Sequence, residues 1–271
     1  MTASFGRFRP ATGNIRWYRS ASVALVTCRE TVIALTFVRS DMTRTAVVAG
    51  VGPGLGASLA RRFDAEGCDV ALFARTPGYI EGLAEELDSG LAATVDVADP
   101  DAVEEGFRTV REAFGPVDLL AFNASGASWT GLLESDTEGF RHALAVGVEG
   151  AFHCAREAVS DMVENDGGTV IFTGATTSVR GREGAVGFSA AKFGARGLAE
   201  SMARELGPEG VHVAHVVVDG GILAPATDTG DRAEHEYLDP DAIANEYWNL
   251  VEQDRSTWTL ELDLRPHVEP F

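Results

Sequence analysis

Three glycines ahead of a helical pattern have the spacing of a phosphate-binding turn. Gly50, Gly54 and Gly56 lie between an apolar run and the helical pattern at 57–66. Gly50 would allow a tight turn, Gly54 would let backbone N–H groups approach a pyrophosphate, and Gly56 would let the helix pack closely. Leu55 lies at the start of this helix, whose N-terminus favours anions. The pattern predicts a dinucleotide-binding turn, and a glycine-rich turn without a ligand is the alternative.

An arginine follows the second apolar run, where a dinucleotide site distinguishes its cofactors. The run ends at Arg75 and Thr76, and no carboxylate is present there to bind a ribose 2′-hydroxyl. A guanidinium pairs well with a 2′-phosphate. We therefore expect NADP rather than NAD, with NAD still possible. Arg75 could also be a solvated surface charge.

Apolar β-rich runs alternate with helical patterns from Thr45 onward, which is typical of a parallel sheet covered on both faces. The sequence therefore predicts an α/β fold: a single-domain, Rossmann-type doubly wound parallel sheet. The expected helices include 102–114, 137–163 and 187–206. The expected strands are 45–49, 69–74, 92–97, 117–123, 168–174, 211–218 and a short one within 258–264.

The spacing Gly-x3-Gly-x-Gly resembles that of the short-chain dehydrogenase/reductase family, and three further segments strengthen this resemblance. Asp96 and Val97 match the pair that meets the adenine ring. Residues 123–126, beginning Asn123-Ala124, match the element that braces the sheet beside the cofactor. Residues 217–222 match a Pro-Gly turn whose following Ile backbone holds the nicotinamide carboxamide, with Asp219 in place of proline. The cofactor contacts implied in this last turn are Gly220 and Ile222.

The resemblance also places the family's catalytic residues, and only one of four is retained. Lys192 matches the lysine of the Tyr-x-x-x-Lys pair, whereas Phe188 replaces the tyrosine. Ala175 replaces the serine, and Gly147 replaces the asparagine. Carbonyl reduction needs a proton on oxygen as hydride reaches carbon, which Phe188 cannot supply. The pattern resembles a divergent branch of the family, and Thr176 is the preferred substitute donor.

Lysine has a physical advantage at position 192, because a compact ammonium fits between two ribose hydroxyls better than a broad guanidinium does. It is the chain's single lysine among 22 basic residues. A surface lysine on an amphipathic helix is the alternative.

Other hydroxyls near Phe188 could relay a proton, although Ser and Thr at strand ends mostly cap turns. They belong to Thr173, Thr177, Ser178 and Ser189.

A metal site is not expected. His212 and His215 are three residues apart on a strand and should face opposite ways. The three cysteines are widely separated, which argues against a disulfide framework and a thiolate metal site and suits a reducing, cytoplasmic compartment.

The chain is strongly acidic, with 41 acidic and 22 basic residues and a formal net charge of −19. This charge repels nucleic acid and anionic membranes, so neither is expected as a partner. Acidity combined with near-absence of lysine resembles proteins of salt-loving cells. An ordinary acidic cytoplasmic protein is the alternative.

Two segments differ from the rest. Residues 1–41 hold six arginines and two acids and differ in this from the rest of the chain, which indicates an N-terminal extension. This extension either results from a mis-assigned start codon or is poorly ordered. Residues 42–271 are expected to form the NAD(P)-binding domain. No membrane span is expected, because Arg29 and Glu30 split the apolar run. Residues 224–253 correspond to a substrate lid, whose Tyr237 or Tyr247 could replace the lost acid, although packing is the safer interpretation.

Two functions from different classes remain open. The first is an oxidoreductase of altered proton delivery that uses NADP(H) or NAD(H) on a small carbonyl, alcohol or activated alkene. The second is a catalytically silent dinucleotide-binding protein, such as a sensor or partner subunit. In either case the helices containing Gly147 and Phe193 match subunit-pairing surfaces of the family, so we expect a homodimer or homotetramer.

Overall fold

The computed structural model describes residues 24–28, 31–35, 43–126, 129–225 and 227–269. The chain divides into two units, residues 1–42 and residues 43–271. In the first unit, β1 (Ala24–Cys28) pairs antiparallel with β2 (Thr31–Leu35). The remaining residues of the predicted N-terminal extension lie outside the described part, so its order and its start codon stay a prediction.

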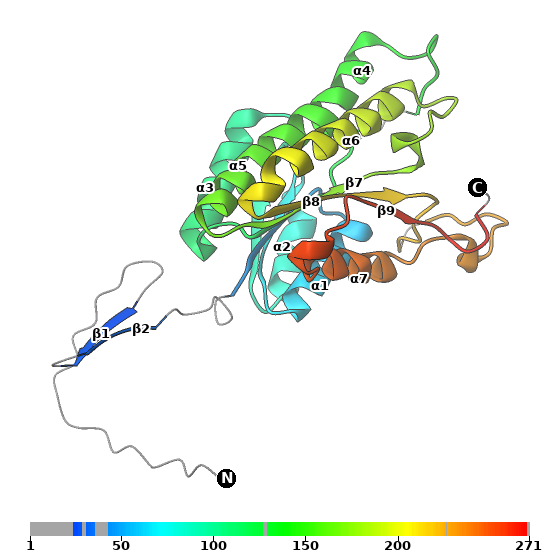
Figure 1. Ribbon diagram of the computed structural model, residues 1–271. Coiled ribbons are helices and arrows are strands. Elements are labelled where there is room, and N and C mark those ends of the chain that lie inside the picture. Colours follow the sequence, from blue (N-terminus) through cyan, green and yellow to red (C-terminus); the bar gives the residue numbers. More distant parts are fainter. Residues whose placement is uncertain (1–23, 29–30, 36–42, 127–128, 226, 270–271) are drawn as a thin grey trace. The chain divides into compact units, whose positions relative to one another are not determined.

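A seven-stranded parallel sheet forms the centre of the second unit, in the order β5-β4-β3-β6-β7-β8-β9 (Figure 1). The prediction of a doubly wound parallel sheet is confirmed. The chain order reverses between β3 and β6, and ligands of such sheets bind outside the carboxyl ends of the strands at this point. The strands are β3 (Thr45–Ala49), β4 (Asp69–Ala74), β5 (Gly90–Thr94), β6 (Leu119–Phe122), β7 (Gly168–Thr173), β8 (Val211–Val218) and β9 (Glu261–Leu264).

Helices cover both faces of this sheet, which explains why its central strands are apolar without alternation. Every residue of β3 and of β8 is buried. In Figure 1, α1, α2 and α7 lie on one face and α3, α5 and α6 on the other. Their bounds are α1 (Leu55–Ala65), α2 (Pro77–Glu86), α3 (Pro100–Phe114), α5 (Gly150–Glu164), α6 (Val186–Leu206) and α7 (Pro240–Val251).

The long helix expected over 137–163 contains a change of winding. It is divided into α4 (Thr137–Leu144), a π-helical turn η1 (Ala145–Glu149) and α5. Single π turns inside α-helices are frequent at functional sites. Here the turn carries Gly147 to the side of α6.

The expected strand 92–97 is wrong at both ends, because β5 begins at Gly90 and ends at Thr94. The chain turns immediately afterwards: Asp96 Oδ1 accepts a hydrogen bond from Ala98 N at 3.0 Å, and the Asp96 carbonyl accepts one from Asp99 N at 3.0 Å. This local turn removes Asp96 and Val97 from the strand and leaves them at the sheet's carboxyl edge.

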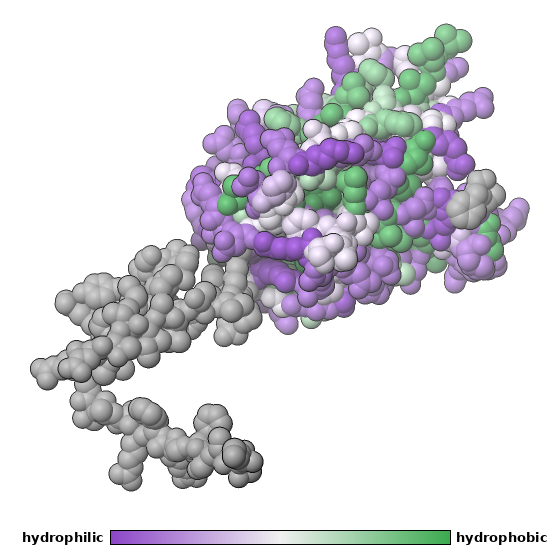
Figure 2. All heavy atoms as spheres, viewed as in Figure 1, coloured by the Kyte–Doolittle hydropathy of each residue, from purple (hydrophilic) through white to green (hydrophobic). Residues whose placement is uncertain are grey.

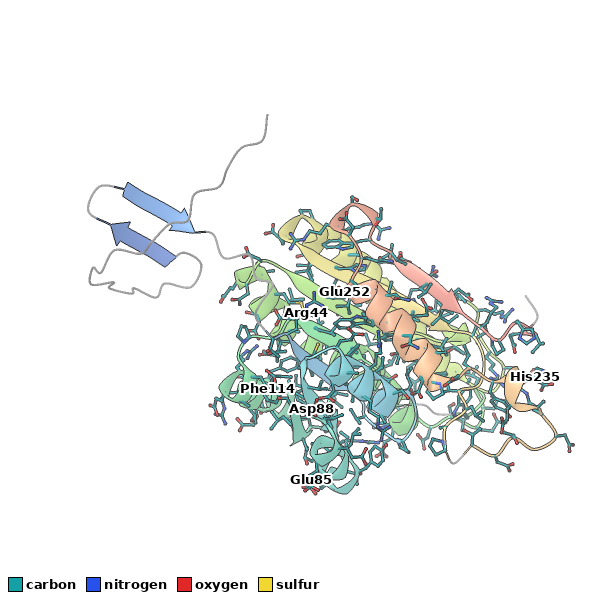
Figure 3. The ribbon with its side chains drawn as sticks, turned by 90° about the horizontal axis from the view of Figure 1, so that it is seen from below. Arg44, Glu85, Asp88, Phe114, His235 and Glu252 are labelled. Atoms are coloured by element: carbon teal, nitrogen blue, oxygen red, sulfur yellow. The ribbon has the colours of Figure 1, made fainter. Side chains whose placement is uncertain are left out.

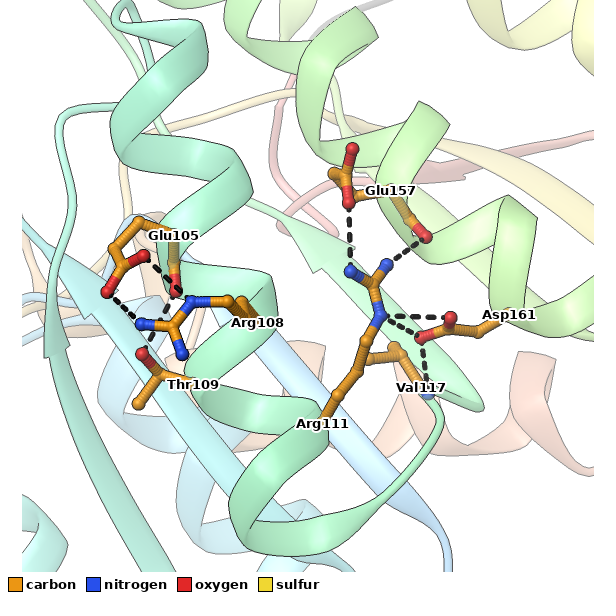
Figure 4. Close-up of polar contacts among 7 residues, drawn as sticks. All are labelled: Glu105, Arg108, Thr109, Arg111, Val117, Glu157 and Asp161. Carbon is orange, nitrogen blue, oxygen red and sulfur yellow. Dashed lines mark hydrogen bonds and ion pairs between the residues drawn. The ribbon is translucent and has the colours of Figure 1, made fainter.

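Ion pairs join elements that the sheet brings together. The Arg111 guanidinium of α3 is 3.0 Å from both Glu157 and Asp161 of α5, and Asp161 also accepts a hydrogen bond from Val117 N at 3.0 Å (Figure 4). Figure 3 shows Arg44, just before β3, beside Glu252, just after α7, with which it forms an ion pair. No helix in the described ranges is long and apolar enough to span a membrane.

Candidate active site

A cleft lies at the carboxyl ends of β3 and β6, where the chain order reverses. One cavity of about 400 Å³ extends from the glycine turn to Arg75 and Asp96. A second, of about 350 Å³, continues past Gly54 to Ile222. These volumes lie within the range of small-molecule sites. Predicted cofactor residues line the two cavities: Gly50, Arg75, Asp96, Val97, Asn123 and Ala124 in the first, and Gly50, Gly54, Leu55, Gly56, Asn123 and Ile222 in the second.

The glycines of this cleft are required by close backbone approach. Gly50 has φ +97°, and a Cβ there would lie 2.4 Å from Ala124 N. A Cβ on Gly56 would lie 2.7 Å from the Gly50 carbonyl oxygen. Asn123 Nδ2 donates a hydrogen bond to the same oxygen at 2.8 Å, which ties β6 to the turn. Gly50, Gly56 and Asn123 therefore shape the cleft together.

Helix α1 begins at this turn with an uncapped N-terminus. Gly54 is its N-cap and provides no side-chain hydrogen bond, and no acidic residue lies in the first turn. Free N–H groups and the helix dipole at such an end favour an anion. A Cβ on Gly54 would lie 3.2 Å from Ala224 Cβ, so the segment after β8 borders the same space. The donor set fits a pyrophosphate.

Arg75 lies at the far end of the cleft, exposed on the loop after β4. Among the described residues no carboxylate pairs with it. Its neighbour in the cavity wall, Tyr79, is 39% exposed. An unpaired guanidinium beside an open cavity is suited to an additional phosphate.

Lys192 of α6 lies buried beneath the carboxyl end of β7. Its Nζ donates a hydrogen bond to the Thr173 carbonyl oxygen at 2.7 Å, and its side chain is 7% exposed. Burial disfavours the ammonium form and lowers the pKa of Lys192 to about 8. The burial of Lys192 excludes the alternative of a surface lysine. Its ammonium group can therefore lose a proton close to neutral pH.

Phe188 lies one helical turn before Lys192 and is 9% exposed. Lys192 Nζ is 5.6 Å from the centroid of its ring, a distance at which a cation is attracted to an aromatic face. The ring of Trp129 packs on Phe188 with centroids 4.9 Å apart. The Phe188 ring therefore occupies the space next to the ammonium but offers no exchangeable proton.

Gly147 has a packing role in this arrangement. A Cβ on Gly147 would lie 2.8 Å from Ala191 Cβ, the residue before Lys192. The π turn and α6 therefore approach so closely that a larger residue would move them apart. Ala175 lies directly after β7 and Gly174, and its backbone N donates to Ser178 Oγ at 3.0 Å.

Thr176 is next to Ala175, and its hydroxyl already has an acceptor. Thr176 Oγ1 donates a hydrogen bond to Asp219 Oδ1. The Asp219 side chain is 4% exposed and also lies 3.2 Å from Arg265 and 3.8 Å from Arg180. Sequence reasoning noticed Asp219 only as a replacement for proline, and this cluster could not be read from local spacing.

The other candidate hydroxyls take part in packing. Thr173 Oγ1 and the Tyr247 hydroxyl share a hydrogen bond of 2.8 Å, and Tyr247 is fully buried in α7 against the face covered by α1. Ser189 Oγ accepts from Arg182 N at 3.3 Å. Thr177 Oγ1 is buried with no partner among the described residues.

The two strand histidines also have structural partners. His212 Nε2 is 2.9 Å from the Thr259 carbonyl oxygen and its ring stacks on Trp258, whereas His215 Nδ1 is 3.3 Å from Glu261. Within the described residues, no group of three or more His, Cys, Asp or Glu side chains could hold a metal ion. Cys68 and Cys154 are buried free thiols.

The family model described as short chain dehydrogenase matches residues 44–235. The chain belongs to the short-chain dehydrogenase family. This match spans the glycine turn, the cleft and Lys192, so the resemblance predicted from the sequence is confirmed.

Individual family members agree with this assignment. The 3-oxoacyl-acyl-carrier-protein reductase MabA of Mycobacterium bovis is 34% identical over 181 residues, which cover 67% of this chain and 70% of MabA. A short-chain dehydrogenase structure from Rhodopseudomonas palustris has a TM-score of 0.73 and 32% identity over 83% of this chain and 99% of its own. An alcohol dehydrogenase from Thermococcus sibiricus, complexed with 5-hydroxy-NADP, has a TM-score of 0.76 and 25% identity over 84% and 98%.

Proposed function

We propose that this short-chain dehydrogenase transfers hydride between NADP(H) and a small carbonyl compound or alcohol, and that the Lys192 ammonium supplies the proton. The observation that carries this proposal is the buried Lys192, held by the Thr173 carbonyl at 2.7 Å beside the carboxyl edge of the sheet. Family membership supports the oxidoreductase class, and a relative solved with an NADP derivative supports an NAD(P) cofactor.

The residues of the cleft fit a dinucleotide along its whole length. The uncapped α1 N-terminus would receive the pyrophosphate, and Asp96 and Val97 would border the adenine. The backbone of Ile222 would hold the nicotinamide carboxamide. When bound, the nicotinamide supplies the hydride. NADP is preferred over NAD in this proposal because Arg75 faces the cavity without a described carboxylate partner.

Proton delivery must differ from a tyrosine mechanism, because Phe188 has no exchangeable proton. The hydroxyl hydrogen of Thr176 is directed to Asp219. Lys192 has N–H groups beyond the one bonded to Thr173, and its pKa of about 8 leaves it largely protonated at neutral pH. During reduction the ammonium would pass one proton to the substrate oxygen, directly or through a bound water, and then regain it from solvent.

The decisive experiment measures cofactor binding and turnover separately. We expect purified protein in about 2 M salt to bind NADPH by calorimetry and to reduce at least one member of a carbonyl panel. Lys192→Met, which keeps the length of the side chain without its charge, should abolish turnover and weaken NADPH binding. Binding without turnover of any carbonyl compound would favour the silent dinucleotide-binding protein instead.

We propose further that the subunits pair through α5 and α6. Phe152 of α5 is 45% exposed and Phe193 of α6 is 43% exposed, and large exposed apolar side chains on neighbouring helices mark interfaces. A cytoplasmic homodimer or homotetramer fits these surfaces. Sedimentation of the protein and of Phe193→Glu in high salt tests the assignment, because the glutamate should yield a smaller species.

The sequence predicts a substrate lid over residues 224–253, and we propose that it ends at residue 239. Residues 240–251 form α7, which packs on α1 and buries Tyr247. Leu238 N donates to the Gly221 carbonyl at 2.8 Å, so the end of the lid returns to the turn after β8. A change in proteolysis at 224–239 on adding cofactor would support this boundary.

A further inference from the structure

Trp129 connects the candidate active site to the surface. One part of its indole packs on Phe188, with ring centroids 4.9 Å apart and planes inclined by 48°. The guanidinium of Arg182 lies over the same indole, 5.3 Å from its centroid. Even so, Trp129 is 58% exposed. Trp129 therefore presents a large aromatic surface to solvent, and it does so beside Phe188, whose ring contacts the Lys192 ammonium.

Hydrogen bonds hold the segment that presents this indole. Thr130 carbonyl accepts from Val186 N, the first residue of α6, at 3.3 Å. Ser135 N and Ser135 Oγ donate to the Gly131 carbonyl at 2.9 and 2.7 Å, and the Ser135 and Thr130 hydroxyls share a hydrogen bond of 2.8 Å. Residues 129–135 thus form a hydrogen-bonded turn anchored to the helix that carries Phe188 and Lys192.

The same turn exposes further apolar side chains. Leu132 is 73% exposed, Leu133 is 93% exposed, and Val179 of the loop after β7 is 40% exposed. Figure 2 shows hydrophobic atoms gathered at the end of the molecule where α4 begins. Exposed apolar surface of this kind costs free energy in water and commonly marks a binding site. Because Trp129 of the same turn packs on Phe188, we take the occupant of this surface to be the molecule that reacts beside Lys192.

We propose that Trp129 is the binding platform for the ring of an aromatic or flat cyclic carbonyl substrate, or of the corresponding alcohol. The ring would stack on the open part of the indole, and the reacting carbon would lie toward Phe188 and Lys192. This inference rests on the proposed function. It adds the substrate class, which the replacement of polar residues by Phe188 and Ala175 also favours because an apolar ring needs no hydrogen-bond partner.

Binding is tested first, since it does not depend on turnover. Acetophenone should quench the tryptophan fluorescence of the NADPH-loaded protein in a saturable way, and Trp129→Ala should lose that component. Trp258→Phe is the matched control, because Trp258 stacks on His212 and lies apart from this platform. Equal quenching of wild type and Trp129→Ala would overturn the proposal, whether or not any carbonyl is reduced.

Kinetics then test selectivity. Trp129→Ala should lower kcat/KM for acetophenone about 10-fold, as expected for a lost stacking contact. The ratio of kcat/KM for acetophenone to kcat/KM for dihydroxyacetone should therefore fall several-fold in Trp129→Ala, and Trp129→Phe should largely restore that ratio. An equal loss for both ketones would overturn the proposal. Failure of wild type to bind NADPH would instead reject the proposed function, which is distinguishable from both results.

Discussion

Thr176 Oγ1 donates its hydrogen bond to Asp219 Oδ1, which joins the loop after β7 to the turn after β8. The carboxylate is 4% exposed and is neutralised by Arg265 and Arg180. If Thr176 replaced the missing acid, as the sequence predicts, its hydroxyl hydrogen would have to break its bond to the buried Asp219 carboxylate. For this reason we prefer Lys192 as the proton source.

Asp219→Ala should lower the free energy of unfolding by about 2 kcal/mol, because the Thr176 hydroxyl loses its buried acceptor, whereas Arg265 keeps its pair with Asp263. Chemical denaturation measures the change. Asp263→Ala is the control, since Asp263 also pairs with Arg265 but its side chain is 42% exposed. If the two variants lost equal stability, the importance of the buried cluster would be refuted.

Carbonyl reduction should decline as the pH rises through about 8, because Lys192 then loses the proton that reduction consumes. Phe188→Tyr with Ala175→Ser should change this profile, since a restored tyrosine takes over proton delivery. The measurement is kcat for reduction between pH 6 and 10. A rate independent of pH across that range would exclude Lys192 as the acid.

Lys192 should also affect stability in a pH-dependent way. Its folded pKa of about 8 lies below the ordinary value of 10.5, so the unfolded chain binds more protons between these values. Folding stability contributed by this group therefore rises from pH 8 to pH 10.5, by about 3 kcal/mol in total. Lys192→Met avoids the cost of burying a charge, so it should have a higher free energy of unfolding than wild type at pH 8. This difference, measured by urea unfolding, should shrink between pH 8 and pH 10.5. A difference that stays constant over this range would contradict the prediction.

Arg75→Asp should reverse the cofactor preference from NADPH to NADH. The guanidinium would pair with a 2′-phosphate, whereas a carboxylate accepts hydrogen bonds from the 2′-hydroxyl. Calorimetry with both cofactors in high salt measures the change, with Arg108→Asp as the control because Arg108 pairs with Glu105 and Glu112 on the exposed side of α3. Equal affinities before and after the substitution would remove Arg75 from the site.

Dilution of salt should destabilise the protein because its net charge is −19. At about 1 M salt the Debye length is roughly 3 Å, so like charges repel one another weakly, whereas in dilute buffer they repel over longer distances. Thermal unfolding at several sodium chloride and potassium chloride concentrations measures the effect. A Tm that does not change with salt concentration would contradict the prediction that the acidic charge destabilises the protein in dilute buffer.

The sequence by itself determined the sheet and the glycine turn. The bounds of β3, β4 and β8 agree with the predicted runs, because strands buried on both faces are continuously apolar and this signal is local. Gly50 and Gly56 could be located because close backbone approach excludes a Cβ. Lys192 could be located because it matches the lysine of the family's Tyr-x-x-x-Lys pair.

Only the tertiary structure decided which side chains meet at the candidate active site. Trp129 reaches Phe188 from a different loop, Asp219 reaches Thr176 from a neighbouring strand end, and Gly147 meets Ala191 across two helices. These pairs lie far apart in the chain, and no local period relates them. They meet because a parallel sheet brings the carboxyl ends of separate strands to one edge, and close packing then determines which side chains make contact.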